Sequence, residues 1–389
     1  MSTAETRSRV PVWLGAIAPV LLVAALLLVF VSLDPLGGLR PVPPVETVAF
    51  ERVKLEPGSI EMQIRNDGPD PVTFAQVLVN DAYWTFTIGN ETLDRLESTL
   101  VRIPYPWDEG LPLNIALVTS SGVTIEHEIE AAAETPQLDG KTLWIYASLG
   151  VYIGVIPIAV GLLWFSALKR ASKRWLGFFL AFTVGLLTFL LVDTVDEGLE
   201  LASETGAALN GPSLFAIGAL VAVVGLFVLE HTLERRRDKG VAGLMLAYFI
   251  AAGIGLHNLG EGLAVGAALA AGEFALGTFL VVGFALHNTT EGLAIVAPLG
   301  TEDARPGLWH FVGLGALAGV PTIAGALLGG SVFSPAWATL AFGVAAGAIA
   351  QVVWTITRAL PAQGRLTTAY GGAGFLVGLV VMYATGLLT

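Results

Sequence analysis

Long runs of apolar residues, separated by short polar or charged segments, dominate the chain. The first run, Val12–Val31, is close to the ~20 residues that a helix needs to cross a bilayer. From residue 143 onward the pattern repeats, and it predicts eight further membrane-spanning helices at about 143–168, 175–192, 213–230, 241–270, 274–299, 308–330, 334–358 and 366–388. We therefore expect a polytopic all-α membrane protein over most of the length.

Between residues 35 and 140 the pattern changes to short segments in which apolar and polar residues often alternate. Turn signals such as Glu56-Pro57-Gly58 and Ser120-Ser121-Gly122 separate these segments. They predict strands at Thr47–Leu55, Ser59–Asn66, Val72–Asn80, Ala82–Ile88, Ser98–Ile103, Leu113–Thr119 and Val123–Ile129. Short strands at this density are typical of a small, immunoglobulin-like β-sandwich.

Three parts follow from the pattern: an N-terminal transmembrane anchor over 1–34, a β-sandwich domain over 35–140, and a helical membrane domain over 141–389. We expect the first span to be a retained signal anchor, because a signal peptide usually has a shorter apolar core and a small-residue cleavage site. A cleaved signal peptide is the alternative. In both cases the β-rich domain lies outside the cytoplasm.

Composition supports the membrane class. Hydrophobic residues make up 54% of the 389 positions and charged residues only 13%, about half the fraction usual in soluble proteins. The chain has no cysteine, which excludes disulfides, thiolate metal ligands and cysteine nucleophiles. The net charge is −12, and the acidic excess lies mostly between residues 40 and 140 and near 193–204. Nucleic-acid binding is therefore not expected.

Basic residues gather in short loops, and this sets the predicted orientation. Counted from a cytoplasmic N-terminus, the basic loops at 169–174, 234–239 and 358–365 fall on the cytoplasmic side, as does the loop with Arg305. The β-sandwich and the C-terminus then lie outside. We expect an integral protein of the plasma (cell) membrane.

The strongest candidate site is a nine-residue motif that occurs twice in neighbouring predicted helices. It reads LHNLGEGLA at 256–264 and LHNTTEGLA at 286–294. A helix brings positions i, i+1 and i+4 near one another, so each copy predicts a triplet on one face: His257, Asn258 and Glu261, and His287, Asn288 and Glu291. An ionisable side chain at the bilayer centre costs at least ~2.5 kcal/mol, so four of them indicate a functional site.

Imidazole nitrogen and carboxylate oxygen suit Zn²⁺ and other divalent first-row metals. The six residues therefore predict a metal site on a transport path. The two carboxylates can bridge two ions, with the asparagine amide oxygens completing one position and the histidine nitrogens the other. A single intramembrane histidine more often joins helices by hydrogen bonds, but the duplication of the whole triplet favours metal binding.

Two further groups are weaker candidates. Four acidic residues recur at helical spacing at the outer end of the second predicted span, where they form either a candidate metal entrance or a solvated helix end: Asp193, Asp196, Glu197 and Glu200. Glu230 and His231 lie at the inner end of the third predicted span and form a candidate metal exit.

With this doubled motif in the fourth and fifth of eight spans, residues 140–389 resemble the zinc–iron permease (ZIP) family of metal transporters. The resemblance implies an eight-helix core, one metal site made by His257, Glu261, His287 and Glu291, and a second made by Asn258, Asn288 and the two bridging glutamates. It also implies metal movement into the cytoplasm, inverted repeats around the two motif helices, sliding of that helix unit against the rest, and homodimers.

The chain departs from the family pattern in places. Gly260 and Thr290 stand where the family often has proline, and Val320 stands before Pro321 where many members have glutamate. The missing glutamate predicts a weaker second site or a single functional metal. The loop after the third span, often rich in histidine in the family, holds only His231 at its edge.

We therefore predict a transporter and not an enzyme, with Zn²⁺ as the preferred cargo, Fe²⁺, Mn²⁺ or Cd²⁺ as other cargoes, and no resident cofactor. A membrane metal sensor or receptor is the first alternative, suggested by the outer domain and the basic loops, but no predicted inner loop exceeds about a dozen residues. An intramembrane metal-dependent hydrolase is the second, but it would need a general base that the motif does not supply.

Overall fold

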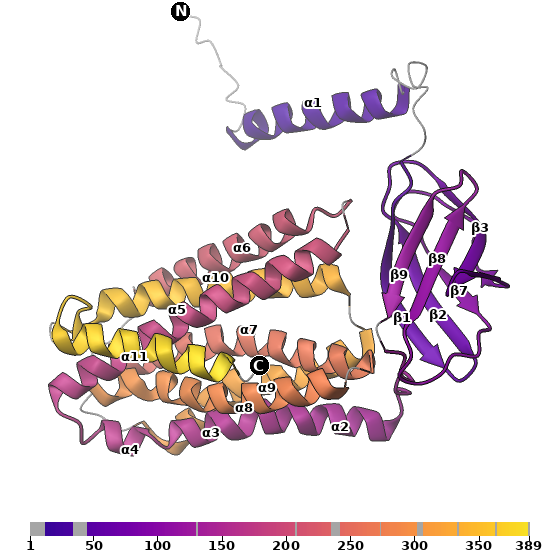
Figure 1. The fold of residues 1–389 in the computed structure, drawn as a ribbon. Coiled ribbons are helices and arrows are strands. Elements are labelled where there is room, and N and C mark those ends of the chain that lie inside the picture. Colours follow the sequence, from indigo (N-terminus) through magenta and orange to yellow (C-terminus); the bar gives the residue numbers. More distant parts are fainter. Residues whose placement is uncertain are drawn as a thin grey trace, which may run out of the picture. The chain divides into compact units, whose positions relative to one another are not determined.

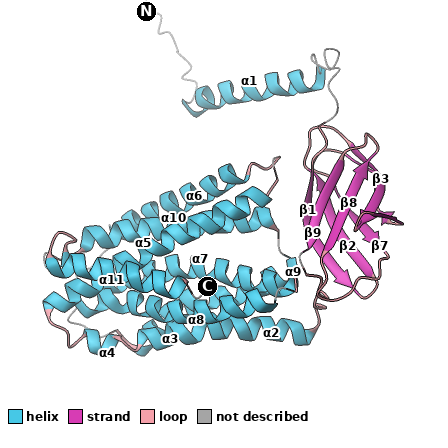
Figure 2. Cartoon of the chain, in the orientation of Figure 1, coloured by secondary structure: helices cyan, strands magenta, loops and turns pink. Residues whose placement is uncertain are grey.

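The computed structural model describes residues 12–33, 45–129, 131–206, 208–234, 242–272, 274–301, 306–332, 334–361 and 364–387. The described chain is mostly helical, with a small β-rich part (Figures 1 and 2). It divides into two units, residues 1–45 and residues 46–389. The predicted basic loops at 234–239 and around Arg305 fall wholly or largely outside the described residues.

The first unit contains helix α1 (Val12–Leu33), where the sequence predicts the N-terminal span. Its large apolar side chains between Leu21 and Leu33 are exposed wherever they are described, for example Leu28 at 71%. A helix that is apolar on all sides needs an apolar environment, and lipid supplies one.

The β-rich part is a sandwich-like pair of antiparallel sheets. One sheet has the order β1 (Val48–Glu56), β2 (Ser59–Asn66), β7 (Ser98–Ile103) and β5 (Thr87–Ile88). The other has the order β4 (Ala82–Trp84), β3 (Val72–Val79), β8 (Leu113–Thr119) and β9 (Thr124–Ile129), with β6 (Thr92–Leu93) paired to β3. Alternate residues of β2 and β8 are buried in a common core, which confirms the predicted sandwich-like region.

The predicted strand Ala82–Ile88 is wrong as a single element. Asn80 and Asp81 have positive φ and form a two-residue turn of the type that closes hairpins, so β4 folds back on β3. The chain then crosses to the other sheet, where β5 pairs with β7. The short β6 was not predicted, because two residues are too few to show an alternating pattern.

Residues 140–387 form the helical part. Its elements are α2 (Gly140–Gly150), the π-helix η2 (Val151–Val155), α3 (Ile156–Leu162), α4 (Phe165–Leu168), α5 (Lys173–Glu204), α6 (Gly211–Glu234), α7 (Ala242–Ala270), α8 (Phe274–Val296), the 3-10 helix η3 (Ala297–Thr301), α9 (Leu308–Val332), α10 (Pro335–Ala359) and α11 (Ala369–Gly386). In the described chain, seven helical segments are long and apolar enough to cross a membrane, and Ala369–Thr385 is apolar but shorter. By length and composition the structure agrees with a polytopic membrane protein.

Two predicted spans differ from the observed helices. The second was expected to end near residue 192, but α5 continues to Glu204, so the acidic residues 193–200 lie within the helix. Charged side chains at helical spacing leave the backbone hydrogen bonds of a helix intact. The first span is interrupted by η2, which ends at Val155, two residues before Pro157. Proline has no N–H to donate to the carbonyl four residues earlier, and a widened turn accommodates it.

The helices pack as two groups of neighbours, named here the motif group (α2 to α3, α7, α8 and α9) and the flanking group (α5, α6, α10 and α11). Glycines allow backbone contact inside each group: a Cβ on Gly262 would lie 2.3 Å from Thr322 O, and one on Gly378 would lie 2.2 Å from Phe182 O. Between the groups, Gly260 of α7 faces the ring of Phe342 on α10. At this point the boundary between the two groups is formed by the Phe342 ring against the backbone of Gly260. Gly262 and Gly378, inside their groups, face backbone atoms instead.

Candidate metal site

The two copies of the motif lie within α7 and α8, which contact each other in the motif group. All six predicted residues are buried, with at most 2% of each exposed: His257, Asn258, Glu261, His287, Asn288 and Glu291. The structure thus brings both triplets into the interior. Buried ionisable groups are costly without partners, so their contacts decide what the site can do.

Glu261 lies between the two imidazoles. Its Oε1 atom is 3.2 Å from Nε2 of His257 and accepts a hydrogen bond from Nε2 of His287. Its Oε2 accepts a hydrogen bond of 2.9 Å from the side-chain amide of Asn288. One carboxylate of α7 therefore contacts both histidines and links the two helices.

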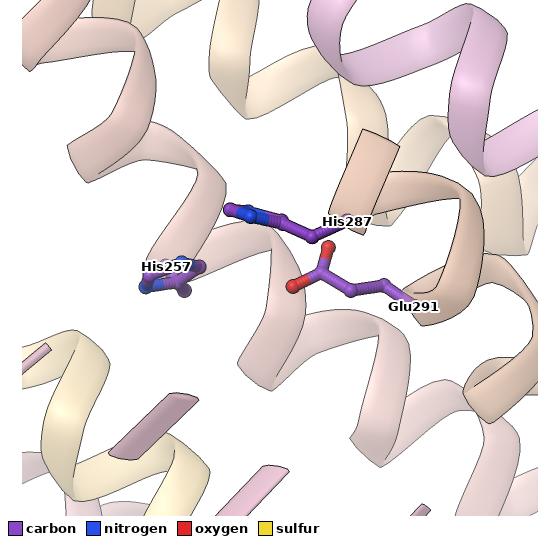
Figure 3. Close-up of side chains that lie close together, drawn as sticks. All are labelled: His257, His287 and Glu291. Atoms are coloured by element: carbon purple, nitrogen blue, oxygen red, sulfur yellow. The ribbon is translucent and has the colours of Figure 1, made fainter. Parts of the chain in front are cut away.

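Three ligand residues, two imidazoles and one carboxylate, converge beside Glu261. His257, His287 and Glu291 each offer a ligand atom, and these atoms lie within 4.8 Å of one another. Figure 3 shows the carboxylate of Glu291 directed toward the two histidines. Around one zinc ion, ligand atoms at normal bond lengths lie about 3.3 Å apart, so small side-chain movements would close this set onto a metal.

Six buried polar atoms at the site make no well-formed hydrogen bond to any described residue, although Nε2 of His257 lies within ion-pair distance of Glu261. They are Nε2 of His257, Nδ1 of His287, the Oδ1 atoms of Asn258 and Asn288, and both carboxylate oxygens of Glu291. Buried polar atoms in proteins are paired in the great majority of cases. Unpaired nitrogen and oxygen atoms at this concentration fit a site whose chemistry is completed by a cation.

The asparagines also join helices, which the sequence did not indicate. Asn258 donates to the carbonyl of Ala318 on α9 at 3.1 Å, and Asn288 donates to the carbonyl of Ile153 in η2 at 2.8 Å. In a regular helix the Ile153 carbonyl would pair with the N–H of residue 157, which is proline. The hydrogen bonds of the two amide nitrogens also fix the orientation of the side-chain oxygens. Metal binding through these oxygens stays a prediction.

Thr194 of α5 is a further residue at the site that sequence reasoning missed. Its hydroxyl lies 2.9 Å from Nδ1 of His257 and 2.7 Å from the carbonyl of Leu190. The hydroxyl of a threonine within an apolar helix usually donates to a carbonyl one turn earlier in the same helix, so the sequence offered no reason to assign Thr194 to the site. The acidic residue beside it, Asp193, was the nearest indication in the sequence.

The candidate entrance residues lie on α5 beside the site. Asp193 and Glu197 are half-buried, whereas Asp196 and Glu200 are exposed. Asp193 interacts electrostatically with both motif histidines, and Glu197 interacts with Asp193 and Glu261. Carboxylates thus extend along α5 from an exposed position to the motif.

The candidate exit residues line a cavity of about 750 Å³. Glu230 and His231 of α6 contribute to it, together with the first turns of α7 and the last turns of α10. The carboxylate of Glu230 accepts hydrogen bonds from Gln351 at 2.8 Å and from Thr355 at 3.1 Å, both on α10. Glu230 is therefore held at the cavity by the flanking group.

Comparisons with known proteins do not assign the chain to a family. No family model matches it, and no curated protein matches it. Among solved structures, it is similar to the archaellum periplasmic stator protein FlaG from Sulfolobus acidocaldarius over 22% of this chain and 100% of that one, with 12% identity and a TM-score of 0.20. A similarity at this level carries no argument about the fold or the function of this chain.

Proposed function

We propose that this protein is a divalent transition-metal transporter that moves Zn²⁺ by preference into the cytoplasm, in the manner of the ZIP family that residues 140–389 resemble. The observation that carries the proposal is the burial of the doubled His-Asn-Glu motif at the contact of α7 and α8, with unpaired ligand atoms facing one another. Under this proposal α11 completes an eight-helix core with the seven longer spans.

The donor set supports a transition-metal cargo. Two imidazoles with carboxylates favour zinc and its first-row neighbours over Mg²⁺ and Ca²⁺, which prefer oxygen ligands alone. Glu261 and Glu291 are buried and together carry two negative charges when ionised, which balances the charge of one divalent cation. The absence of thiolates keeps the affinity compatible with release.

The helix packing supports a path through the site. Carboxylates along α5 attract cations and raise their concentration near the motif. The metal then exchanges its water for the ligands of α7 and α8, and leaves toward the cavity that Glu230 and His231 line. Sliding of the motif group against the flanking group would expose the site to each side in turn, and the N-terminus would be cytoplasmic and the C-terminus outside.

Uptake by the purified protein in proteoliposomes tests the proposal. We expect saturable uptake of Zn²⁺ that a tenfold excess of Mg²⁺ or Ca²⁺ does not inhibit, with Mn²⁺ and Fe²⁺ compared side by side. Empty liposomes are the control for leakage. Binding of Zn²⁺ without uptake would contradict transport and favour a metal sensor, and no binding would mean that the motif only joins helices.

A further inference from the structure

Thr194 links the candidate metal site to the flanking group. It is fully buried in α5, and its hydroxyl lies 2.9 Å from Nδ1 of His257, which belongs to α7 of the motif group. Among the described residues, the other hydrogen bonds of the motif side chains stay inside the motif group, as those of Asn258 to α9 and of Asn288 to η2 do. The Thr194 contact therefore crosses the boundary along which the proposed sliding would occur.

The hydrogen positions follow from counting donors and acceptors. A hydroxyl has one hydrogen, and the carbonyl of Leu190, 2.7 Å from Thr194 Oγ1, can only accept a hydrogen bond. The hydroxyl hydrogen is thus donated to Leu190, and Oγ1 accepts from Nδ1–H of His257. A neutral imidazole with its proton on Nδ1 has its lone pair on Nε2. This atom lies 3.2 Å from Oε1 of Glu261 and makes no well-formed hydrogen bond to a described residue, so a cation between the two atoms would use both lone pairs.

We propose that Thr194 is a positioning residue that holds the imidazole of His257 with the Nε2 lone pair toward the cation. Through this bond, the affinity for the cation depends on the position of the motif group relative to the flanking group. The proposal rests on the transporter function above. Partners that orient a metal-binding histidine through its second nitrogen raise its affinity for metal. When α7 moves along α5 by more than the length of a hydrogen bond, His257 loses this partner and the cation is bound less tightly. Movement and release are thereby coupled.

Zinc binding to three variants of the full-length protein in detergent tests this role by isothermal titration calorimetry. Thr194→Val removes the hydroxyl at nearly constant volume, and we expect the dissociation constant for Zn²⁺ to rise about ten- to hundredfold. Thr194→Ser keeps the hydroxyl and should restore binding. The matched control is Thr183→Val. It removes a buried hydroxyl of the same helix that donates to the carbonyl of Phe179, one turn earlier, and this variant should bind zinc as the wild type does.

Transport kinetics give a second readout. Thr194→Val should raise KM for Zn²⁺ without lowering the maximal rate, because the proposal has the Thr194–His257 bond already broken once the helices slide, so its loss weakens binding and not the movement. Unchanged zinc affinity in Thr194→Val, or an equal loss in Thr183→Val, would overturn the role of Thr194. If Thr194→Val does not fold, Thr194→Ala takes its place in the same comparison. Failure of the wild type itself to bind zinc would instead contradict the proposed function, so the two failures are distinguishable.

Discussion

The imidazole rings of His257 and His287 lie with their centroids 6.4 Å apart, and the Nε2 atoms of both face the same carboxylate oxygen of Glu261. The two histidines occupy the same position in two copies of one motif. Because α7 and α8 follow each other along the chain and contact each other, the repeat places its polar residues opposite one another in a buried interior. A cation that replaces the proton between His287 and Glu261 would join the two helices at this point.

The first prediction concerns metal and stability. A cation that binds the folded state alone adds about 2.7 kcal/mol to the free energy of unfolding at a hundred times its dissociation constant. We expect Zn²⁺ to raise the thermal unfolding midpoint of the protein in detergent, and EDTA to reverse the rise. Glu291→Gln removes a ligand charge and should reduce the effect sharply, whereas Glu126→Gln on the exposed face of β9 should not. An unfolding midpoint of the wild type that does not change when Zn²⁺ is added would contradict metal binding at this site.

Helical spacing allowed the sequence to place each triplet on one face of its helix, and the structure has both triplets on buried faces of α7 and α8. Metal binding by them stays a prediction. The sequence could not predict the partners of Asn288 or His257. The carbonyl of Ile153 accepts from Asn288 beside a π-helical turn, and no residue pattern marks such a turn beyond the following Pro157. Thr194 reaches the site from a helix distant in sequence, and only packing reveals that.

The second prediction separates the roles of asparagine and histidine. Paired His257→Ala and His287→Ala substitutions should remove tight zinc binding, because both unpaired ring nitrogens are lost. Asn258→Ala and Asn288→Ala should keep it but destabilise the protein, each by about 1–3 kcal/mol, because a buried carbonyl loses its donor. Metal analysis and thermal unfolding measure the two effects. Loss of all bound metal in the asparagine variants, with retention in the histidine variants, would reverse this assignment.

The third prediction tests the close contact of α7 with α9. A Cβ on Gly262 would lie 2.3 Å from Thr322 O and 2.8 Å from the backbone nitrogen of Ala326, so Gly262→Ala must push the helices apart. We expect a loss of about 1–3 kcal/mol in the free energy of unfolding. A Cβ on Gly225 of α6 would meet no described atom within 4 Å, so Gly225→Ala should be neutral or mildly stabilising. Equal unfolding midpoints for the two variants would show that α7 and α9 are not packed this closely.

The fourth prediction concerns pH and the β-sandwich. Burial lowers the pKa of His127 below its usual 6.5, and the ring stacks on Phe50 at 4.7 Å between centroids. The unfolded chain therefore binds the proton more readily than the folded one, so the sandwich is most stable above pH 6.5 and loses stability as the pH falls below it. Hydrogen exchange of the sandwich amides between pH 7.5 and 5.5 should show this loss after correction for intrinsic rates. In His127→Gln the pH dependence of stability should be smaller than in the wild type. An unchanged pH dependence in this variant would show that other groups cause it.

The most direct test of the central claim is Zn²⁺ uptake into proteoliposomes by the wild type, Glu261→Ala and the matched control Glu126→Ala. Glu261 contacts both histidines and Asn288, so its loss removes the charge at the centre of the site. Glu126 lies at an exposed position of β9, distant in sequence from the motif. Transport through the motif predicts saturable uptake by the wild type and by Glu126→Ala, and none by Glu261→Ala at equal reconstitution. Undiminished uptake by Glu261→Ala would contradict a path through this site.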